Sequence, residues 1–166
     1  MKYLILVIMV SQFFTSCSTT LNQLVNDKPS KTKMLVGLSN RGGLQQDPFS
    51  GWFNKEYGSY GLNKEAVQVI KNDSENLSIK LFMGTWCGDS RREVPRIYQI
   101  LDAADFDESR LTLINVDREK KSPDGEEIGL NIHHVPTLIL YKNSSEIGRV
   151  IESRLYNRWK KIWPRS

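Results

Sequence analysis

The chain has 166 residues, of which 39% are apolar, 25% are charged and 10% are aromatic. This length allows one ordinary domain with a buried core, and the composition argues against disorder throughout. The formal net charge of +4 comes from 23 basic and 19 acidic side chains that are mostly interleaved, so we expect no nucleic-acid partner. Two cysteines and two histidines exclude a disulfide-rich scaffold, and we expect no metal site and no cofactor.

The first residues have the pattern of an export signal. Lys2 gives a positive start, residues 3–10 are all apolar, and small residues precede Cys17. This pattern predicts a signal peptide over residues 1–16, because the apolar run is too short to span a bilayer as a mature helix.

Cys17 directly follows the small residues Thr15 and Ser16, which resembles the lipobox of bacterial lipoproteins. The resemblance implies that Cys17 becomes the acylated first residue and anchors the protein to a membrane of the cell envelope, facing the periplasm. Phe14 departs from the family, which prefers Leu, Val or Ile there. The alternative is ordinary secretion, with Cys17 lost or without a role.

The segment after Cys17 is polar and contains Pro29, which predicts a lipid-anchored tether over residues 17–32. An N-terminal extension and a first helix are expected over residues 33–76. Within it, residues 34–36 predict an edge strand, and residues 37–61, rich in glycine and aromatics, predict a loop or short helix over the core, or a wall of a substrate cleft. The helix is expected over residues 62–70, capped by Asn63.

Residues 77–83 alternate and then become apolar, as expected for a central strand. Apolar residues then recur at steps of three and four, so a helix begins near Cys87 or Gly88 and contains Pro95, which should kink it. The remaining predicted elements are strands at 111–116, 135–141 and 146–151, and a closing amphipathic helix marked by Leu155, Trp159 and Ile162. This order predicts a mixed sheet with helices on both faces.

Three features together resemble the thioredoxin superfamily. The run Trp86-Cys87-Gly88-Asp89-Ser90 follows a strand, Pro95 lies inside the next helix, and Val135-Pro136-Thr137 opens the later hairpin. The run from Cys87 to Pro95 looks especially like extracytoplasmic thioredoxin-like proteins of bacteria with a cell envelope. The resemblance implies a thioredoxin-like three-layer α/β/α fold with a mixed central sheet, with the core over residues 77–166.

The resemblance also implies the roles of the site residues. Cys87 is the nucleophile, and its place at a helix N-terminus favours the reactive thiolate. Pro136 is the cis proline beside the sulfur, Val135 pairs its backbone with a bound polypeptide, and Trp86 covers the site. The plainer alternatives are a trans proline at a strand start and a core tryptophan.

Two departures from the family change the expected mechanism. Ser90 stands where the family has its second, resolving cysteine, and Leu81 stands where the family often buries an aspartate that serves that thiol. An acylated Cys17 would leave one free thiol, so no internal disulfide could form. Ser90 can still donate a hydrogen bond to the Cys87 thiolate.

Two hypotheses of function follow. The first is a single-cysteine thiol–disulfide exchange enzyme, with isomerase or mixed-disulfide chemistry on polypeptide or small-molecule thiols and disulfides. The second is a non-catalytic module that binds polypeptides. A redox sensor, or pairing with the cysteine of a second protein, is left as a further alternative. We expect a monomer.

Other polar groups have weaker patterns. Neighbouring strand residues point to opposite faces, so His133 and His134 cannot easily share a metal, although one could adjoin the site. Asp89, Glu93 and Asp117 could pass a proton to the leaving thiol, or could be plain solvated charges. The basic residues of the closing helix could face an anionic membrane or only solvent.

Overall fold

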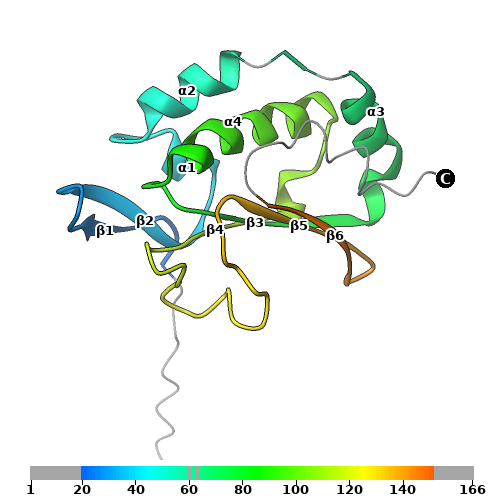
Figure 1. The fold of residues 1–166 in the computed structure, drawn as a ribbon. Coiled ribbons are helices and arrows are strands. Elements are labelled where there is room, and N and C mark those ends of the chain that lie inside the picture. Colours follow the sequence, from blue (N-terminus) through cyan, green and yellow to red (C-terminus); the bar gives the residue numbers. More distant parts are fainter. Residues whose placement is uncertain (1–19, 60, 63, 152–166) are drawn as a thin grey trace, which may run out of the picture.

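The computed structural model describes residues 20–59, 61, 62 and 64–151, which build a six-stranded sheet with helices against it (Figure 1). The strand order is β1-β2-β4-β3-β5-β6. Only β3 and β4 run parallel, and each of the other neighbouring pairs is antiparallel. The sheet is therefore mixed, as predicted. The strands are β1 Gln23–Asp27, β2 Thr32–Ser39, β3 Leu77–Met83, β4 Leu111–Asn115, β5 Thr137–Lys142 and β6 Ser145–Ile151.

The helices lie on one face of the sheet, above it in Figure 1. Helix α4 begins directly after Cys87 and contains Pro95, as the sequence predicts. The Gly- and aromatic-rich region forms two helices, α1 and α2, that precede α3. The bounds are α1 Arg41–Leu44, α2 Ser50–Ser59, α3 Lys64–Asp73 and α4 Gly88–Ala103, with short 3-10 turns at Ser74–Asn76 and Glu108–Arg110.

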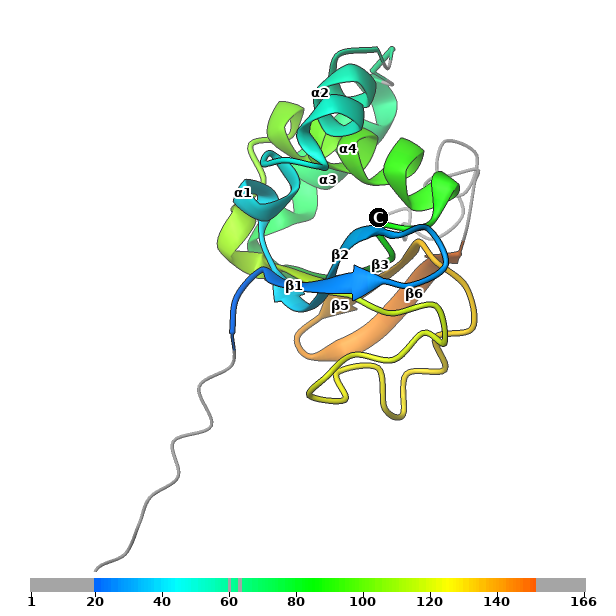
Figure 2. The ribbon, with the colours of Figure 1, turned by 90° about the vertical axis from the view of Figure 1, so that its left-hand side faces the viewer.

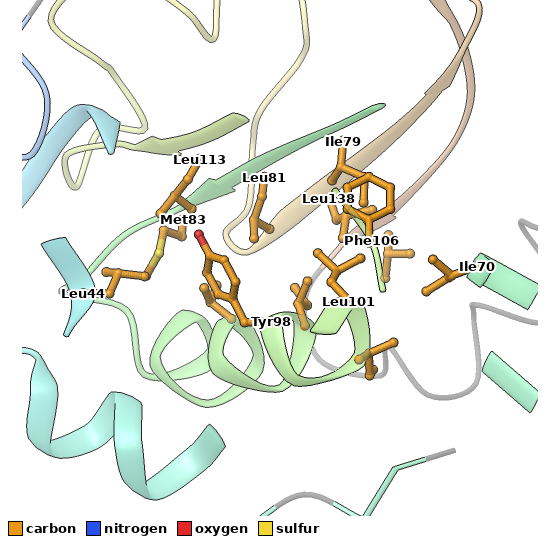
Figure 3. Packing of buried hydrophobic residues seen from close by; sticks show 14 of the residues in the cluster. Leu44, Ile70, Ile79, Leu81, Met83, Tyr98, Leu101, Phe106, Leu113 and Leu138 are labelled. Atoms are coloured by element: carbon orange, nitrogen blue, oxygen red, sulfur yellow. The ribbon is translucent and has the colours of Figure 1, made fainter. Parts of the chain in front are cut away.

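The main core fills the space between the helices and the sheet (Figure 3). Leu81 and Met83 of β3 face Tyr98 and Leu101 of α4, and all four side chains are buried. The steps of three and four along α4 put its apolar side chains on this inner face. Phe53 of α2 packs edge-on against Tyr98, which adds a further layer of aromatic contacts.

The opposite face of the sheet carries a second, smaller apolar cluster. Phe82, Ile114 and Ile139 point to this face from three neighbouring strands, and Ile132 and Val135 cover them from the connection before β5. In the described chain this connection contains no helix (Figure 1). The predicted α/β class with a mixed sheet is confirmed, and the connection is irregular, as its loop-like sequence predicts. The closing helix predicted after β6 lies outside the described residues.

The N-terminal segment differs from the prediction. Residues 17–32 were expected to be a tether, yet Gln23–Asp27 form β1 and pair with β2. Figure 2 brings β1 to the front, where it forms the edge of the sheet, so β2 is an interior strand rather than the predicted edge. The tether prediction is wrong for these residues because polarity alone was used, and edge strands are commonly polar.

Several predictions concern residues outside the described ones. These are the signal peptide over residues 1–16, Cys17, the cap Asn63, and the closing helix with its basic residues. Within the described ranges, no helix is long and apolar enough to cross a membrane.

Candidate functional site

Cys87 lies at the N-terminal end of α4, as the N-cap residue. Strand β3 ends at Met83, and a tight turn follows in which the Cys87 backbone N–H donates to the Gly84 carbonyl over 2.9 Å. The Cys87 carbonyl accepts the first helical hydrogen bond, from the Arg91 N–H over 3.0 Å. The Cys87 side chain is a free thiol and is partly exposed. The fold thus presents the sulfur beside unpaired helix N–H groups, where an anion is favoured.

The loop before β5 brings Val135 and Pro136 against this sulfur. The Val135–Pro136 peptide is cis, which confirms the conformation that the resemblance implied. The Cys87 Sγ donates to the Val135 carbonyl over 3.3 Å. Thr137 holds the same loop, because its hydroxyl donates to the His134 carbonyl over 2.7 Å. Residues that are 48 positions apart therefore meet at one point.

Ser90 is fully buried in the first turn of α4. Its hydroxyl accepts from the Gly84 N–H over 3.3 Å and so ties the helix to the turn before Cys87. The hydrogen bond that we expected from Ser90 to the Cys87 sulfur is not among the contacts of the described residues. Leu81 is also fully buried, inside the helix-side core. Ser90 and Leu81, the two departures from the family, are therefore both fully packed against their neighbours.

Trp86 lies next to Cys87 and is partly exposed. Its indole Nε1 donates to the Val116 carbonyl over 2.9 Å, and its ring packs against the smaller apolar cluster. Gly84 lies so close to the indole that a Cβ there would stand 2.5 Å from a ring carbon. Trp86 therefore packs against the smaller apolar cluster while part of it stays exposed.

Sequence reasoning missed two cations at Trp86. The Arg118 guanidinium carbon lies 5.2 Å from the centroid of the Trp86 ring, and the Lys120 Nζ lies 5.9 Å from it. Asp27 of β1 holds Arg118 through two hydrogen bonds of 2.8 Å each. These bonds, with a further one from Ser30, lower the pKa of Asp27 to about 2. No local pattern indicates this site, because Asp27 and Arg118 meet only through the sheet.

The other charged groups near Cys87 are mostly paired. Arg92 donates to Asp89 over 2.7 Å and to Glu93 over 2.8 Å, so these three charges offset one another. Arg91 instead donates from Nε to the Thr85 carbonyl over 2.5 Å. Asp89 and Glu93 are thus ion-paired rather than poised as proton carriers in this arrangement.

The remaining candidate groups lie further from a clear role. The Asp117 carboxylate accepts from the backbone N–H groups of Glu119 and Lys121, so it organises its own turn. His133 and His134 are both exposed. Among the described residues, no group of three or more metal-ligating side chains comes together.

The comparison with known families decides the classification. The family model for thioredoxin matches residues 61–162, more than half of the chain. The chain belongs to the thioredoxin family. Thioredoxin of Chlamydia pneumoniae is 31% identical over 70 residues, which are 42% of this chain and 63% of that protein. The chain thus spans less than two thirds of that relative. The family-model match begins at residue 61, after the β1–β2 hairpin and α2.

Solved thioredoxin structures are more distant. The Plasmodium falciparum thioredoxin shares 22% identity over 54% of this chain and 82% of its own, with a TM-score of 0.40. Mitochondrial thioredoxin 3 of Saccharomyces cerevisiae, in its oxidised form, shares 24% identity. That match covers 64% of this chain and 96% of the yeast chain, also with a TM-score of 0.40.

Proposed function

We propose that this protein catalyses thiol–disulfide exchange with Cys87 as its single nucleophile, through isomerase or mixed-disulfide chemistry. The observation that carries the proposal is Cys87 itself, a partly exposed residue at a helix N-terminus. Its sulfur lies 3.3 Å from the Val135 carbonyl, beside a cis proline. A second sulfur is absent from position 90, where Ser90 is buried. This combination supports attack of Cys87 on a disulfide, without release of the resulting mixed disulfide by a second thiol at position 90.

The proposed reaction is an exchange of sulfur bonds. The Cys87 thiolate attacks one sulfur of the substrate disulfide, a bond between Cys87 and that sulfur forms, and the substrate S–S bond breaks. The leaving thiolate takes a proton from water. A second thiol, from the substrate or from a small-molecule thiol, then attacks the mixed disulfide and regenerates Cys87. The number of disulfides is unchanged, so no external oxidant is required.

The residues around Cys87 would have separate tasks in this reaction. The Val135 backbone would pair with an extended polypeptide, while the cis Pro136 would shape the loop against the sulfur. Trp86 provides an apolar surface for the substrate. Ser90 would act by fixing the Gly84 turn, because its hydroxyl accepts from the Gly84 N–H.

The test is turnover of a scrambled disulfide protein and of a mixed disulfide by the full chain. We expect Cys87→Ser to abolish both activities while leaving the thermal unfolding midpoint nearly unchanged, because Cys87 is only partly buried. The matched control is Cys17→Ser, which removes the other cysteine and should retain activity. Unchanged turnover in Cys87→Ser would refute the proposal.

A binding module is the second candidate, favoured by the missing second thiol. In that case the surface of Trp86, Val135 and Pro136 would hold a polypeptide without chemistry. The rate of alkylation at neutral pH separates the two. A Cys87 that reacts no faster than the thiol of an unstructured peptide favours the module, whereas faster reaction favours the enzyme.

We also propose that the protein is a lipoprotein of the bacterial cell envelope, monomeric and anchored through Cys17. The support is the sequence alone: a basic start, a short apolar run, and small residues before Cys17. The test is metabolic labelling with a fatty-acid analogue. Label should enter the wild-type chain and be lost in Cys17→Ser but not in Cys87→Ser. Equal labelling of all three chains, or of none, would contradict it.

A further inference from the structure

Arg118 is held as a fixed cation beside the active-site tryptophan. Its Nε and Nη2 both donate to the Asp27 carboxylate over 2.8 Å, and its side chain remains 35% exposed. The two bonds to Asp27 use the Nε and Nη2 atoms of the guanidinium. The third nitrogen, Nη1, has no acceptor among the described residues. Because Asp27 already holds the Arg118 guanidinium in place, little side-chain entropy remains to be lost when Nη1 binds an anion.

Lys120 supplies a second cation at the same ring. The Lys120 N–H donates to the Asp117 carbonyl over 3.0 Å, and the residue has a left-handed φ of 63°, so the turn fixes where its side chain leaves the backbone. Its Nζ lies 5.9 Å from the Trp86 centroid. Within the described part of the chain, Lys120 has no carboxylate partner. Two cations therefore converge on one indole, next in sequence to Cys87.

Of the two cations, Arg118 is offset by Asp27, so Lys120 carries the positive charge that no ion pair of the described residues offsets. Asp27 is buried and engaged by Arg118, and Asp117 is engaged by two backbone N–H groups. Asp89 is paired with Arg92. Glu119 is the remaining acid of the turn, and it is exposed. Arg91, which donates to a backbone carbonyl, adds a further positive charge on the helix side.

We propose that Arg118 and Lys120 form an anion-binding subsite at Trp86, which selects disulfide substrates that carry a carboxylate close to the reacting sulfur. This inference rests on the proposed function, because it names the substrate class of the same site. The carboxylate would bind the free edge of Arg118 and the Lys120 ammonium while the adjacent disulfide meets Cys87. Its source is an acidic side chain of a peptide or a small acidic disulfide.

The experiment uses short peptides of one length, each with a cysteine activated as a neutral thiopyridyl disulfide and flanked by Glu, Gln or Lys. Release of thiopyridone measures attack by Cys87 in the Cys17→Ser background. We expect the Glu peptide to react about threefold to tenfold faster than the Lys peptide at low salt, with the preference shrinking as salt is added. Dithiodiglycolate and hydroxyethyl disulfide form the small-molecule arm, and a preference confined to peptides or to small disulfides identifies the source.

Two variants locate the effect. Lys120→Gln should remove most of the preference for the Glu peptide over the Lys peptide. The matched control, Lys121→Gln, makes the same charge change at the next residue, which is exposed and makes no contact with Trp86 among the described residues. An equal loss in both variants would overturn the subsite in favour of general electrostatic attraction. Equal rates for the Glu and Lys peptides would overturn it outright.

The proposed function can fail separately. If no peptide is attacked, the exchange reaction is refuted, and binding of unreactive Glu and Lys peptides to the Cys87→Ser chain then tests the subsite alone. Tighter binding of the Glu peptide that disappears in Lys120→Gln would uphold it, and equal binding would overturn it.

Discussion

The two faces of the sheet differ in how they are covered. We expect the helix side to contribute most of the stability and the opposite side to shape the candidate site. The helix side is a large apolar core in which α4 contributes a regular row of buried side chains. The opposite side has a small cluster covered by an irregular segment, and Trp86 and Cys87 lie at its margin. Regular packing thus holds the sheet, while the loops of the other side are free to shape the site.

A pair of substitutions on β3 tests this division most strongly. Leu81 and Phe82 are adjacent and fully buried, but they point to the helix side and the site side respectively. Leu81→Ala should cost about 2–5 kcal/mol and Phe82→Ala about 3–5 kcal/mol of unfolding free energy, because each leaves a cavity. Denaturant unfolding measures both losses.

The same pair should differ in reactivity. Under conditions where both variants are folded, Phe82→Ala should change the alkylation rate of Cys87, because Phe82 belongs to the cluster against which Cys87 packs. Leu81→Ala should leave that rate unaltered. A similar rate change in both variants would mean that the faces are coupled rather than separate.

Gly84→Ala addresses the site side alone. An added Cβ would lie 2.5 Å from one Trp86 ring carbon and 2.6 Å from Nε1, so the indole must move and its bond to Val116 is broken. We expect a loss of about 1–3 kcal/mol and a shift in tryptophan fluorescence. Gly88→Ala is the control, since nothing lies within 4 Å of its added Cβ. Equal effects of the two substitutions would contradict the close approach of Trp86.

Asp102→Ala addresses the helix side alone. The Asp102 carboxylate accepts from Arg41 over 2.6 and 2.8 Å and from the Tyr57 hydroxyl over 2.6 Å, which joins α1, α2 and α4. Removing it should cost about 1–2 kcal/mol while Cys87 reactivity is retained. Lys71→Ala, at an exposed ion pair, should cost less than about 1 kcal/mol. A loss of reactivity in Asp102→Ala would place this network in the site.

The smallest expected effect is the acid dependence of the Asp27–Arg118 pair. The pKa of Asp27 is lowered from 3.8 to about 2, first by the Arg118 hydrogen bond. The pair therefore stabilises the fold fully above pH 3.8, and this contribution is lost as the pH falls through about 2. In Asp27→Asn, the free energy of unfolding should change less with pH across that window. An unaltered acid profile in the variant would show that the pair does not contribute.

The sequence predicted the regular parts of the molecule better than the irregular ones. The 3.6-residue period located α4, and the alternation of residues 77–83 located β3. The family pattern located the cis bond at Pro136, but it gave no indication of the second cis bond, between Asp47 and Pro48. Asp27 and Arg118 are distant in sequence, and their pairing depends on the sheet order, which no local pattern contains.

The role expected for Ser90 shows a similar limit. Spacing within a helix put its hydroxyl within reach of Cys87, but a buried hydroxyl bonds to whichever backbone group the turn leaves unpaired. Here that group is the Gly84 N–H. The identity of a hydrogen-bond partner is thus decided by the turn geometry rather than by residue type.

The fate of a mixed disulfide tests the central claim most directly. The chain, in the Cys17→Ser background, is mixed with a neutral disulfide peptide without added thiol, and intact mass is followed over time. The account predicts that one peptide per chain attaches at Cys87 and stays, whereas Ser90→Cys releases it by forming an internal disulfide. Failure of Cys87 to form the adduct, or equally fast release from both chains, would contradict a single-sulfur mechanism.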